Sequence, residues 1–417
     1  MAQDSTSPVK TTKALDDYVL LGRSGLRVSP LCLGALTFGE QRGLGANKEE
    51  SKKVFDLYYE KGGNFIDTAC SYNLGEVINN TTVQKERRFN PNFGGNHRKS
   101  LVENLDGSLK RLNMSYVDIL YVHVYEYRTP IEEFMRSLDD VVRSGKVLYV
   151  AVSDIPSWAL SRANTMAELR GWNPFIGLQT RYNLLDRSLE FDLQPACAEL
   201  GIGILPWSIV ADGFLTGKYK RETNINLKSD YRNRSIINYS KDEKNWQILD
   251  EVIAISKEIN RSPVQIALPY KKRKFGICPE KYGKCPEIFR ASGKHSETVM
   301  FWNIFRTLDS GQIPDKFWSV KKMSGIWLNW IQQKPGITSP LIGARTVAQL
   351  EENLKSLEFK LTPEQMKRLD DVSQPTGREV PFPYSMTDSF DVFIGKNMQV
   401  PNKFAPIATT YNYGRLY

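Results

Sequence analysis

The feature that most constrains this chain is an alternation of short apolar segments with amphipathic ones. Segments typical of buried strands occupy residues 64–69, 116–127, 147–154, 175–183 and 202–208. Segments with helical spacing lie at 47–63, 97–113, 130–146, 156–171 and 188–201. Strands that are separated by helices pair side by side in a parallel sheet. So many repeats in one chain predict a (β/α)8 barrel, an α/β fold, rather than a doubly wound sheet.

The first ordered segment has a different pattern. Residues 19–39 predict a hairpin that turns at Ser24 and Gly25 and is followed by an apolar strand. No GxGxxG motif opens a helix after a strand, which disfavours a Rossmann nucleotide site.

Composition excludes several classes of protein. The chain has 417 residues, of which 41% are hydrophobic and 25% charged, as in a globular protein with a sizeable core. No segment approaches the roughly 18 apolar residues of a membrane helix, and the N-terminus lacks a secretory apolar region. The five cysteines are scattered without metal-ligand spacing. We therefore expect a cytoplasmic protein without a metal site or membrane contact.

The net charge of +9 raises the question of nucleic-acid binding. An excess of about seven basic residues lies within 271–325, and the rest of the chain is close to neutral. This distribution does not predict a nucleic-acid partner.

Polar residues follow the predicted strands at their carboxyl ends, where barrel enzymes carry their catalytic groups. They are Asp67, His123, Ser153, Asp154, Gln179, Trp207 and Ser208. Each has a structural alternative, such as a helix cap, a core histidine or a buried tryptophan. Their convergence on one rim favours a site.

Eight segments in order resemble the aldo-keto reductase superfamily, most closely its fungal aryl-alcohol-dehydrogenase-like branch. Among them are "NFIDTACSY", "VDILYVHVYEY", "GKVLYVAVSD", "GLQTRYNLLDR" and "SPLIGARTVAQLEENL". The resemblance covers most of residues 16–380. It implies a barrel that binds NADP(H) and interconverts an aldehyde or ketone and an alcohol.

The resemblance also implies catalytic roles. Tyr72 matches the tyrosine that protonates the carbonyl oxygen, Asp67 the supporting aspartate, and His123 the histidine that orients the carbonyl. These roles suit the chemistry, because hydride transfer builds negative charge on oxygen and a nearby donor must supply a proton.

Cofactor contacts follow from the same resemblance. Ser153, Asp154 and Gln179 match positions that hold the nicotinamide carboxamide, and Trp207 matches the aromatic residue that stacks on its ring. The implied contacts to the rest of the cofactor are Ser208, Gly213 and Leu215 at the pyrophosphate, Arg345 at the 2′-phosphate, and Gln349, Glu352 and Asn353 at the adenosine. An arginine before a helix N-terminus suits a phosphate and favours NADP over NAD.

The chain departs from the family pattern after Tyr72. The family has a helix and then a strand ending in a catalytic lysine before the "GGN" segment, whereas here Gly94 follows Tyr72 by only 22 positions. We therefore expect one helix-strand unit to be missing or distorted. Lys85 is the candidate substitute for that lysine; its structural alternative is a solvated side chain in a charged loop.

The second departure is an insertion at 269–325, basic and rich in aromatic residues. It is interpreted as a docking module, a localisation-like basic patch or a solvated segment. A gene-model error would explain both departures.

The expected organisation is a flexible N-terminus at 1–15, a barrel at 16–380 and a tail at 381–417. We expect an NADPH-dependent oxidoreductase acting on an aromatic or polyketide-like carbonyl or alcohol, in fungal secondary metabolism. The alternative is a catalytically impaired nucleotide-binding barrel or an interaction protein.

Overall fold

The computed structural model describes residues 13–40, 45–69, 72, 95–221, 233–259 and 324–375. Lys85, nearly all of the expected insertion and the whole expected tail lie outside these ranges. The predictions made for them therefore stay predictions.

The strands within the described ranges follow the predicted segments. They are β1 (Val19–Leu20), β2 (Arg27–Val28), β3 (Cys32–Gly34), β4 (Ile66–Asp67), β5 (Val117–Val122), β6 (Val147–Ser153), β7 (Phe175–Arg181), β8 (Gly203–Trp207) and β9 (Leu341–Ile342). The strand predicted at 116–127 was too long. The strand ends at Val122, and in the turn that follows Glu126 accepts hydrogen bonds from the backbone N–H groups of Asn96 and Arg128.

The helices also follow the amphipathic segments. The α-helices are α1 (Lys48–Glu60), α3 (Arg98–Leu112), α4 (Ile131–Arg143), α5 (Ser157–Arg170), α6 (Leu193–Leu200), α7 (Asn233–Ser240), α8 (Glu243–Glu258), α9 (Ser324–Gln332), α10 (Val347–Leu354) and α11 (Pro363–Val372). Short 3-10 turns lie at η1 (Ala35–Thr37), η3 (Ser188–Glu190), η4 (Ala211–Thr216) and η8 (Lys355–Glu358). The single helix predicted at 188–201 is divided into η3 and α6, because Asp192 has a non-helical φ of −141°.

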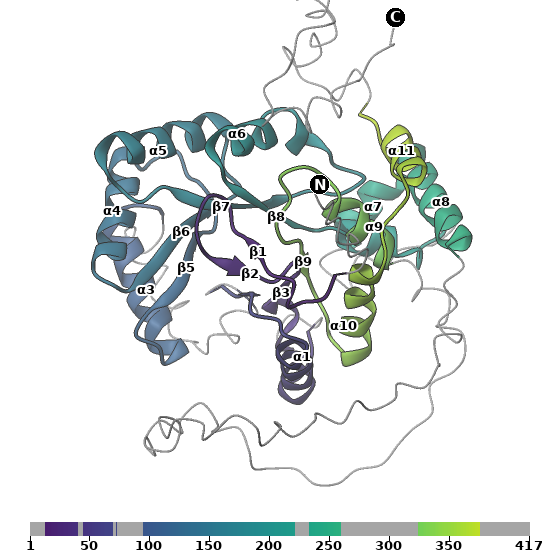
Figure 1. Ribbon diagram of the computed structural model, residues 1–417, viewed down its shortest axis with the longest axis horizontal. Helices are drawn as coiled ribbons and strands as arrows, with labels where there is room; N and C mark the ends of the chain where they lie inside the picture. The colour runs from purple at the N-terminus through teal and green to yellow at the C-terminus, as the bar shows by residue number, and fades with distance from the viewer. Residues whose placement is uncertain are drawn as a thin grey trace, which may run out of the picture.

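Parallel pairing connects the strands into one wall. One sheet has the order β4-β3-β9 and the other β5-β6-β7-β8, and a parallel bridge from Ile204 on β8 to Ile337 links the two. Helices surround these strands, as in a (β/α)8 barrel (Figure 1). Within the described residues the wall runs from β4 to β5. Residues 73–94, where we expect a missing or distorted unit, connect these two strands and lie outside the described ranges.

The predicted hairpin is confirmed as β1 and β2, which pair antiparallel and lie across the central strands (Figure 1). It approaches the barrel wall closely at Gly22, where an added side-chain carbon would lie 2.5 Å from the carbonyl oxygen of Ile176. Gly22 also has a φ of +56°, a conformation that favours glycine. Since Ile176 and Gly203 lie at the starts of β7 and β8, the hairpin covers the amino-terminal end of the strands. The carboxyl ends form the opposite mouth.

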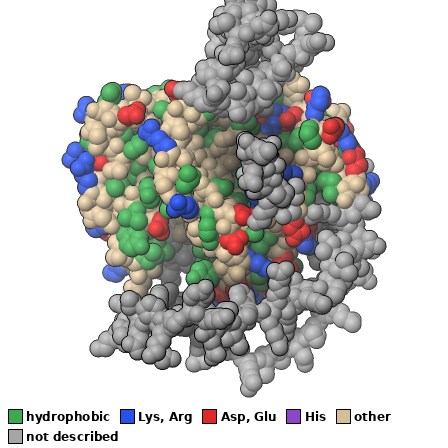
Figure 2. Space-filling view, viewed as in Figure 1, with side chains coloured by type: hydrophobic (Ala, Val, Ile, Leu, Met, Phe, Trp, Pro, Cys, Tyr) green, Lys and Arg blue, Asp and Glu red, His purple; other side chains and the backbone are tan. Residues whose placement is uncertain are grey.

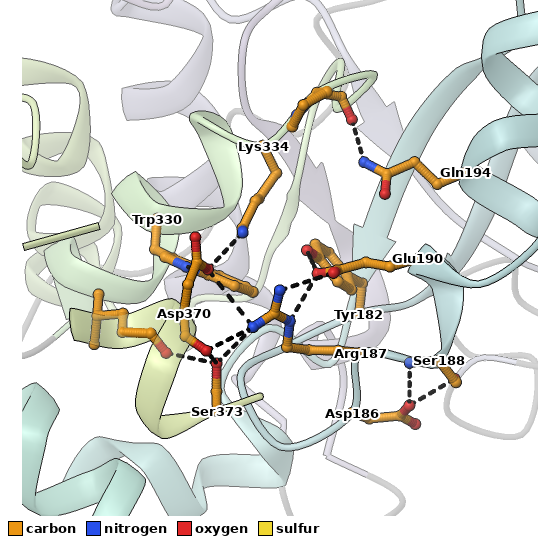
Figure 3. Close-up of polar contacts among 12 residues, drawn as sticks. Tyr182, Asp186, Arg187, Ser188, Glu190, Gln194, Trp330, Lys334, Asp370 and Ser373 are labelled. Carbon is orange, nitrogen blue, oxygen red and sulfur yellow. Dashed lines mark hydrogen bonds and ion pairs between the residues drawn. The ribbon is translucent and has the colours of Figure 1, made fainter. Parts of the chain in front are cut away.

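A buried ion-pair network fastens the C-terminal helices to the loop after β7 (Figure 3). The guanidinium of Arg187 donates two hydrogen bonds of 2.8 Å to Glu190, and both side chains are almost fully buried. Arg187 also donates to the backbone oxygen of Asp370 at 3.0 Å, and Lys334 pairs with the Asp370 carboxylate at 2.5 Å. The network joins residues 183 positions apart, so it stabilises the packing of distant segments against one another rather than any single helix.

The described surface visible in Figure 2 carries acidic and basic side chains interspersed with one another. Among the described helices, none combines the length and apolar character that crossing a membrane requires.

Candidate active site

The carboxyl ends of β4 to β8 bring the predicted polar residues to one end of the barrel. Parallel strands end on the same side, so residues distant in sequence meet there. Asp67 is the last residue of β4, His123 follows β5, and Ser153 is the last residue of β6. Gln179 lies in β7, and Trp207 ends β8.

Asp67 is the centre of the polar contacts. Its Oδ2 accepts a 2.9 Å hydrogen bond from the phenol of Tyr72, and its Oδ1 accepts a 3.0 Å bond from the amide of Gln179. Gln179 was predicted to hold a cofactor carboxamide. Its amide N–H group is also directed at Asp67, so it orients the carboxylate that holds Tyr72.

His123 lies against Tyr72 on the open side of this pair. The two ring centroids are 6.0 Å apart and the ring planes meet at 82°. His123 is exposed, whereas Tyr72 is half-buried. The structure therefore brings together Asp67, Tyr72 and His123, three of the four predicted catalytic residues.

The environment of Tyr72 keeps its phenol protonated. Burial, followed by the negative charge of Asp67 and the hydrogen bond to it, raises the pKa of Tyr72 well above its ordinary value. A phenol in this state can donate a hydrogen bond but releases its proton reluctantly. Lys85, the predicted cation for this site, lies outside the described residues.

Asp154 and Trp207 form a second polar contact on the rim. The indole Nε1 of Trp207 donates to Oδ1 of Asp154 at 3.3 Å. Asp154 has a φ of +46°, which turns the chain away from β6 directly after the buried Ser153. Burial raises the pKa of Asp154, although hydrogen bonds from Trp207 and Thr180 oppose this shift.

The loop after β8 makes several sharp turns. Positive φ angles occur at Ser208, Ala211, Asp212 and Gly213. The carbonyl oxygen of Ser208 accepts a 3.0 Å bond from Asn183, and Gly213 and Leu215 are buried within η4. The backbone N–H groups of Ala211, Gly213 and Leu215 donate to carbonyl oxygens of Ser208 and Val210, so these bonds hold the loop in its turned shape.

The residues expected at the phosphate and adenosine lie directly before α10 and along it. Thr346 caps this helix, and the Arg345 backbone N–H donates to Gln349 at 2.8 Å. Asn353 donates to the carbonyl oxygen of Gly343 at 3.2 Å, so it holds the turn between β9 and α10. Glu352 forms an ion pair with Lys355.

The chemistry of these side chains is compatible with a nicotinamide dinucleotide. The rim offers a carboxylate, an amide and an indole beside the candidate proton donor. The start of α10, with Arg345 directly before it, offers donors for a phosphate.

Two residues below the rim were missed by sequence reasoning. Tyr121 lies two positions before His123 on β5, and its buried hydroxyl has no hydrogen-bond partner in the described structure. Space for this hydroxyl is left by Gly177 on β7, where an added side-chain carbon would lie 3.1 Å from it. Cys32 is also buried here, and burial followed by the charge of Asp67 raises the pKa of its thiol. The period-two alternation of β5 was the signal that could have placed Tyr121 inside.

This chain is similar to known oxidoreductases of one family. The aldo/keto reductase family model matches residues 30–284 and 313–374. A norsolorinic acid reductase B from Aspergillus parasiticus is 34% identical over 280 residues, covering 60% of this chain and 72% of that protein. An aryl-alcohol dehydrogenase from Pestalotiopsis microspora is 34% identical over 312 residues. The match covers 68% of this chain and 79% of that protein. An NADP(+) aryl-alcohol dehydrogenase from Phanerodontia chrysosporium is 28% identical over 395 residues, covering 88% of each chain.

Proposed function

The chain belongs to the aldo/keto reductase family, and from this premise we propose that it is an NADP(H)-dependent reductase of aromatic or polyketide-like aldehydes and ketones. The observation that carries the proposal is the hydrogen bond from Tyr72 to Asp67, with His123 beside it, at the carboxyl ends of β4 and β5. The substrate class is supported by the names of two similar fungal proteins, an aryl-alcohol dehydrogenase and a norsolorinic acid reductase.

The proposed roles follow from the contacts. When bound, the cofactor supplies the hydride. Tyr72 donates the proton to the developing alkoxide, and His123 orients the carbonyl oxygen by a hydrogen bond. Asp67 holds the phenol in place, and Gln179 holds Asp67.

The preference for NADP rests on Arg345. Its guanidinium presents a fork that suits a phosphate group, and it directly precedes the capped N-terminus of α10. One or two charge-assisted hydrogen bonds to the 2′-phosphate are worth roughly 10- to 100-fold in affinity. We expect Arg345→Gln to weaken NADPH binding by that factor and to leave NADH binding within about twofold. Equal losses for both cofactors would contradict this role.

The experiment on activity follows NADPH oxidation with a substituted benzaldehyde. Tyr72→Phe should lower kcat by roughly 10²- to 10⁴-fold while the Kd for NADPH stays constant. The matched control is Tyr59→Phe, which removes an exposed hydroxyl on α1, away from the barrel mouth. Turnover that survives Tyr72→Phe would defeat the proposed role of this tyrosine.

A second function is favoured by the raised pKa of Tyr72. A buried phenol tied to a carboxylate is a poor proton donor unless a cation lowers its pKa. The alternative is therefore a barrel that binds NADP(H) without efficient turnover. NADPH binding in the absence of turnover would support it. If turnover occurs, a loss of kcat in Lys85→Met would assign the missing cation to Lys85, and an unchanged kcat would exclude it.

A further inference from the structure

Three aromatic side chains form a cluster on the rim beyond His123. Tyr125 and Tyr127 belong to the turn that follows β5, and Trp158 lies in the first turn of α5, directly after β6. We call these three residues the aromatic shelf. Both of their segments begin at the carboxyl ends of strands, so the shelf lies at the same end of the barrel as Asp67 and Tyr72.

The ring geometry gives the two outer rings of the shelf similar orientations. Tyr125 is buried and meets both other rings edge-on, at 74° to Tyr127 and 89° to Trp158. Tyr127 and Trp158 are tilted by only 36° to one another, with centroids 6.5 Å apart. They are 74% and 52% exposed, so a large part of each side chain is open to solvent. A buried tyrosine thus supports two exposed rings of similar orientation.

Hydrogen bonds fix the turn that carries the shelf. Asn96 donates to the carbonyl oxygen of Val124 at 3.1 Å. The Glu126 carboxylate accepts hydrogen bonds from the Arg128 backbone at 2.7 Å and from the Thr129 hydroxyl. The rings therefore need little reordering when a ligand binds, which lowers the entropic cost of binding.

The distance to the candidate site suits a substrate of more than one ring. Tyr125 follows His123 by two residues, so their Cα atoms lie roughly 7 Å apart or less. The exposed rings of Tyr127 and Trp158 lie beyond Tyr125, with centroids 5.3 and 6.1 Å from its ring. If the carbonyl group of a substrate lies between Tyr72 and His123, the ring that carries it occupies the site. A second ring fused to the first would then extend toward the shelf. Clustered aromatic side chains exposed to water often mark a binding site. The shelf would extend the candidate site formed by Tyr72 and His123.

We propose that the aromatic shelf determines specificity for flat, fused-ring aromatic carbonyl compounds by stacking on the ring farther from the reacting carbonyl. This inference rests on the proposed function and adds the residues and the shape that select the substrate. Flat rings stack on aromatic faces with a gain that a puckered saturated ring of similar size does not obtain.

The test compares two aldehydes of different shape. One is 2-naphthaldehyde, which is flat, and the other is 4-cyclohexylbenzaldehyde, whose distal ring is puckered. We expect the full-length enzyme to show a higher kcat/KM for the flat compound. Trp158→Ala should lower the ratio of the two kcat/KM values by roughly tenfold, mainly through KM, since one stacking contact is lost. Tyr127→Ala should lower it in the same direction, and Trp158→Phe should restore most of it.

The control variant is Tyr59→Ala, because Tyr59 is another exposed aromatic residue, 70% exposed and stacked on Phe55 of α1, with no part in the shelf. In Tyr59→Ala the ratio of the two kcat/KM values should equal that of the unmodified chain. Thermal melting should show that all variants fold. An unchanged ratio in both Trp158→Ala and Tyr127→Ala overturns the proposal; a shelf that receives a protein partner or residues 376–417 would give this result. Absence of turnover with either aldehyde in the unmodified chain would instead defeat the proposed function.

Discussion

The phenol of Tyr72 donates a 2.9 Å hydrogen bond to Oδ2 of Asp67, so the candidate proton donor is tied directly to a negative charge. Burial is the main reason that the pKa of Tyr72 is raised, and Asp67 raises it further by its charge and by the hydrogen bond. The contribution of Asp67 can be removed without changing the shape of the site.

Asp67→Asn should lower the pKa of Tyr72, because an amide carries no negative charge and accepts a weaker hydrogen bond. The pKa should still exceed the ordinary tyrosine value, since burial remains. Absorbance titration of phenolate at 295 nm would measure the change, with the Tyr72→Phe partner of each variant subtracted to isolate this residue. A pKa that is unchanged or raised by Asp67→Asn would contradict the assigned cause.

Several buried phenols make the fold sensitive to alkali. Burial raises the pKa values of Tyr58, Tyr72, Tyr121 and Tyr182 above the ordinary value of about 10. Above that pH the unfolded chain loses protons that the folded chain keeps. The free energy of unfolding should therefore fall as pH rises beyond about 10, by up to ~1.4 kcal/mol per pH unit for each such phenol.

Urea unfolding at pH values between 8 and 11 would measure this dependence. Tyr58→Phe removes one of the phenols and should make the decline less steep. A free energy of unfolding that stays constant or rises across this range would show that the buried phenols do not control alkaline stability.

The hydroxyl of Tyr121 is buried without a hydrogen-bond partner in the described structure. Tyr121→Phe should therefore leave stability unchanged or raise it by about 1 kcal/mol, since an unsatisfied polar group is removed. The same exchange at Tyr182 deletes a 2.5 Å hydrogen bond to Glu190 and should lower stability by about 1–3 kcal/mol. Chemical denaturation of both variants would give the comparison. A larger loss at Tyr121 than at Tyr182 would reveal a bonding partner for the Tyr121 hydroxyl.

Arg187 should be the most sensitive residue of the buried network. Arg187→Met leaves Glu190 buried without its cation and should lower the free energy of unfolding by about 3–5 kcal/mol. Arg187→Met combined with Glu190→Leu should recover part of this loss, because no unpaired charge remains.

The surface pair Lys367–Asp371 provides the control for Arg187. Both side chains are largely exposed, so Lys367→Met should change stability by less than about 1 kcal/mol. Urea midpoints and slopes would be measured for all three variants. Equal effects of Arg187→Met and Lys367→Met would show that burial adds nothing to the network.

Local sequence patterns predicted the individual helices and strands and the residues at their ends. The Asn47 cap, the spacing of apolar residues in α1 and the Ser24-Gly25 turn depend on close neighbours, so their elements could be predicted. The alternation of strands and helices predicted the parallel wall, and with it the rim positions of Asp67, His123 and Trp207. Resemblance to a known family supplied the expected chemistry of those positions.

Which of these residues touch depends on how distant segments pack together. Gln179 reaches Asp67 across 112 positions, and Arg187 reaches Asp370 across 183. The orientation of Tyr127 and Trp158 and the isolated hydroxyl of Tyr121 likewise depend on how separate strands and helices pack. Local patterns encode the conformation of a segment, because they act through nearby backbone and side-chain contacts. Register and packing between distant segments depend on how the whole core fills, and no single segment carries that information.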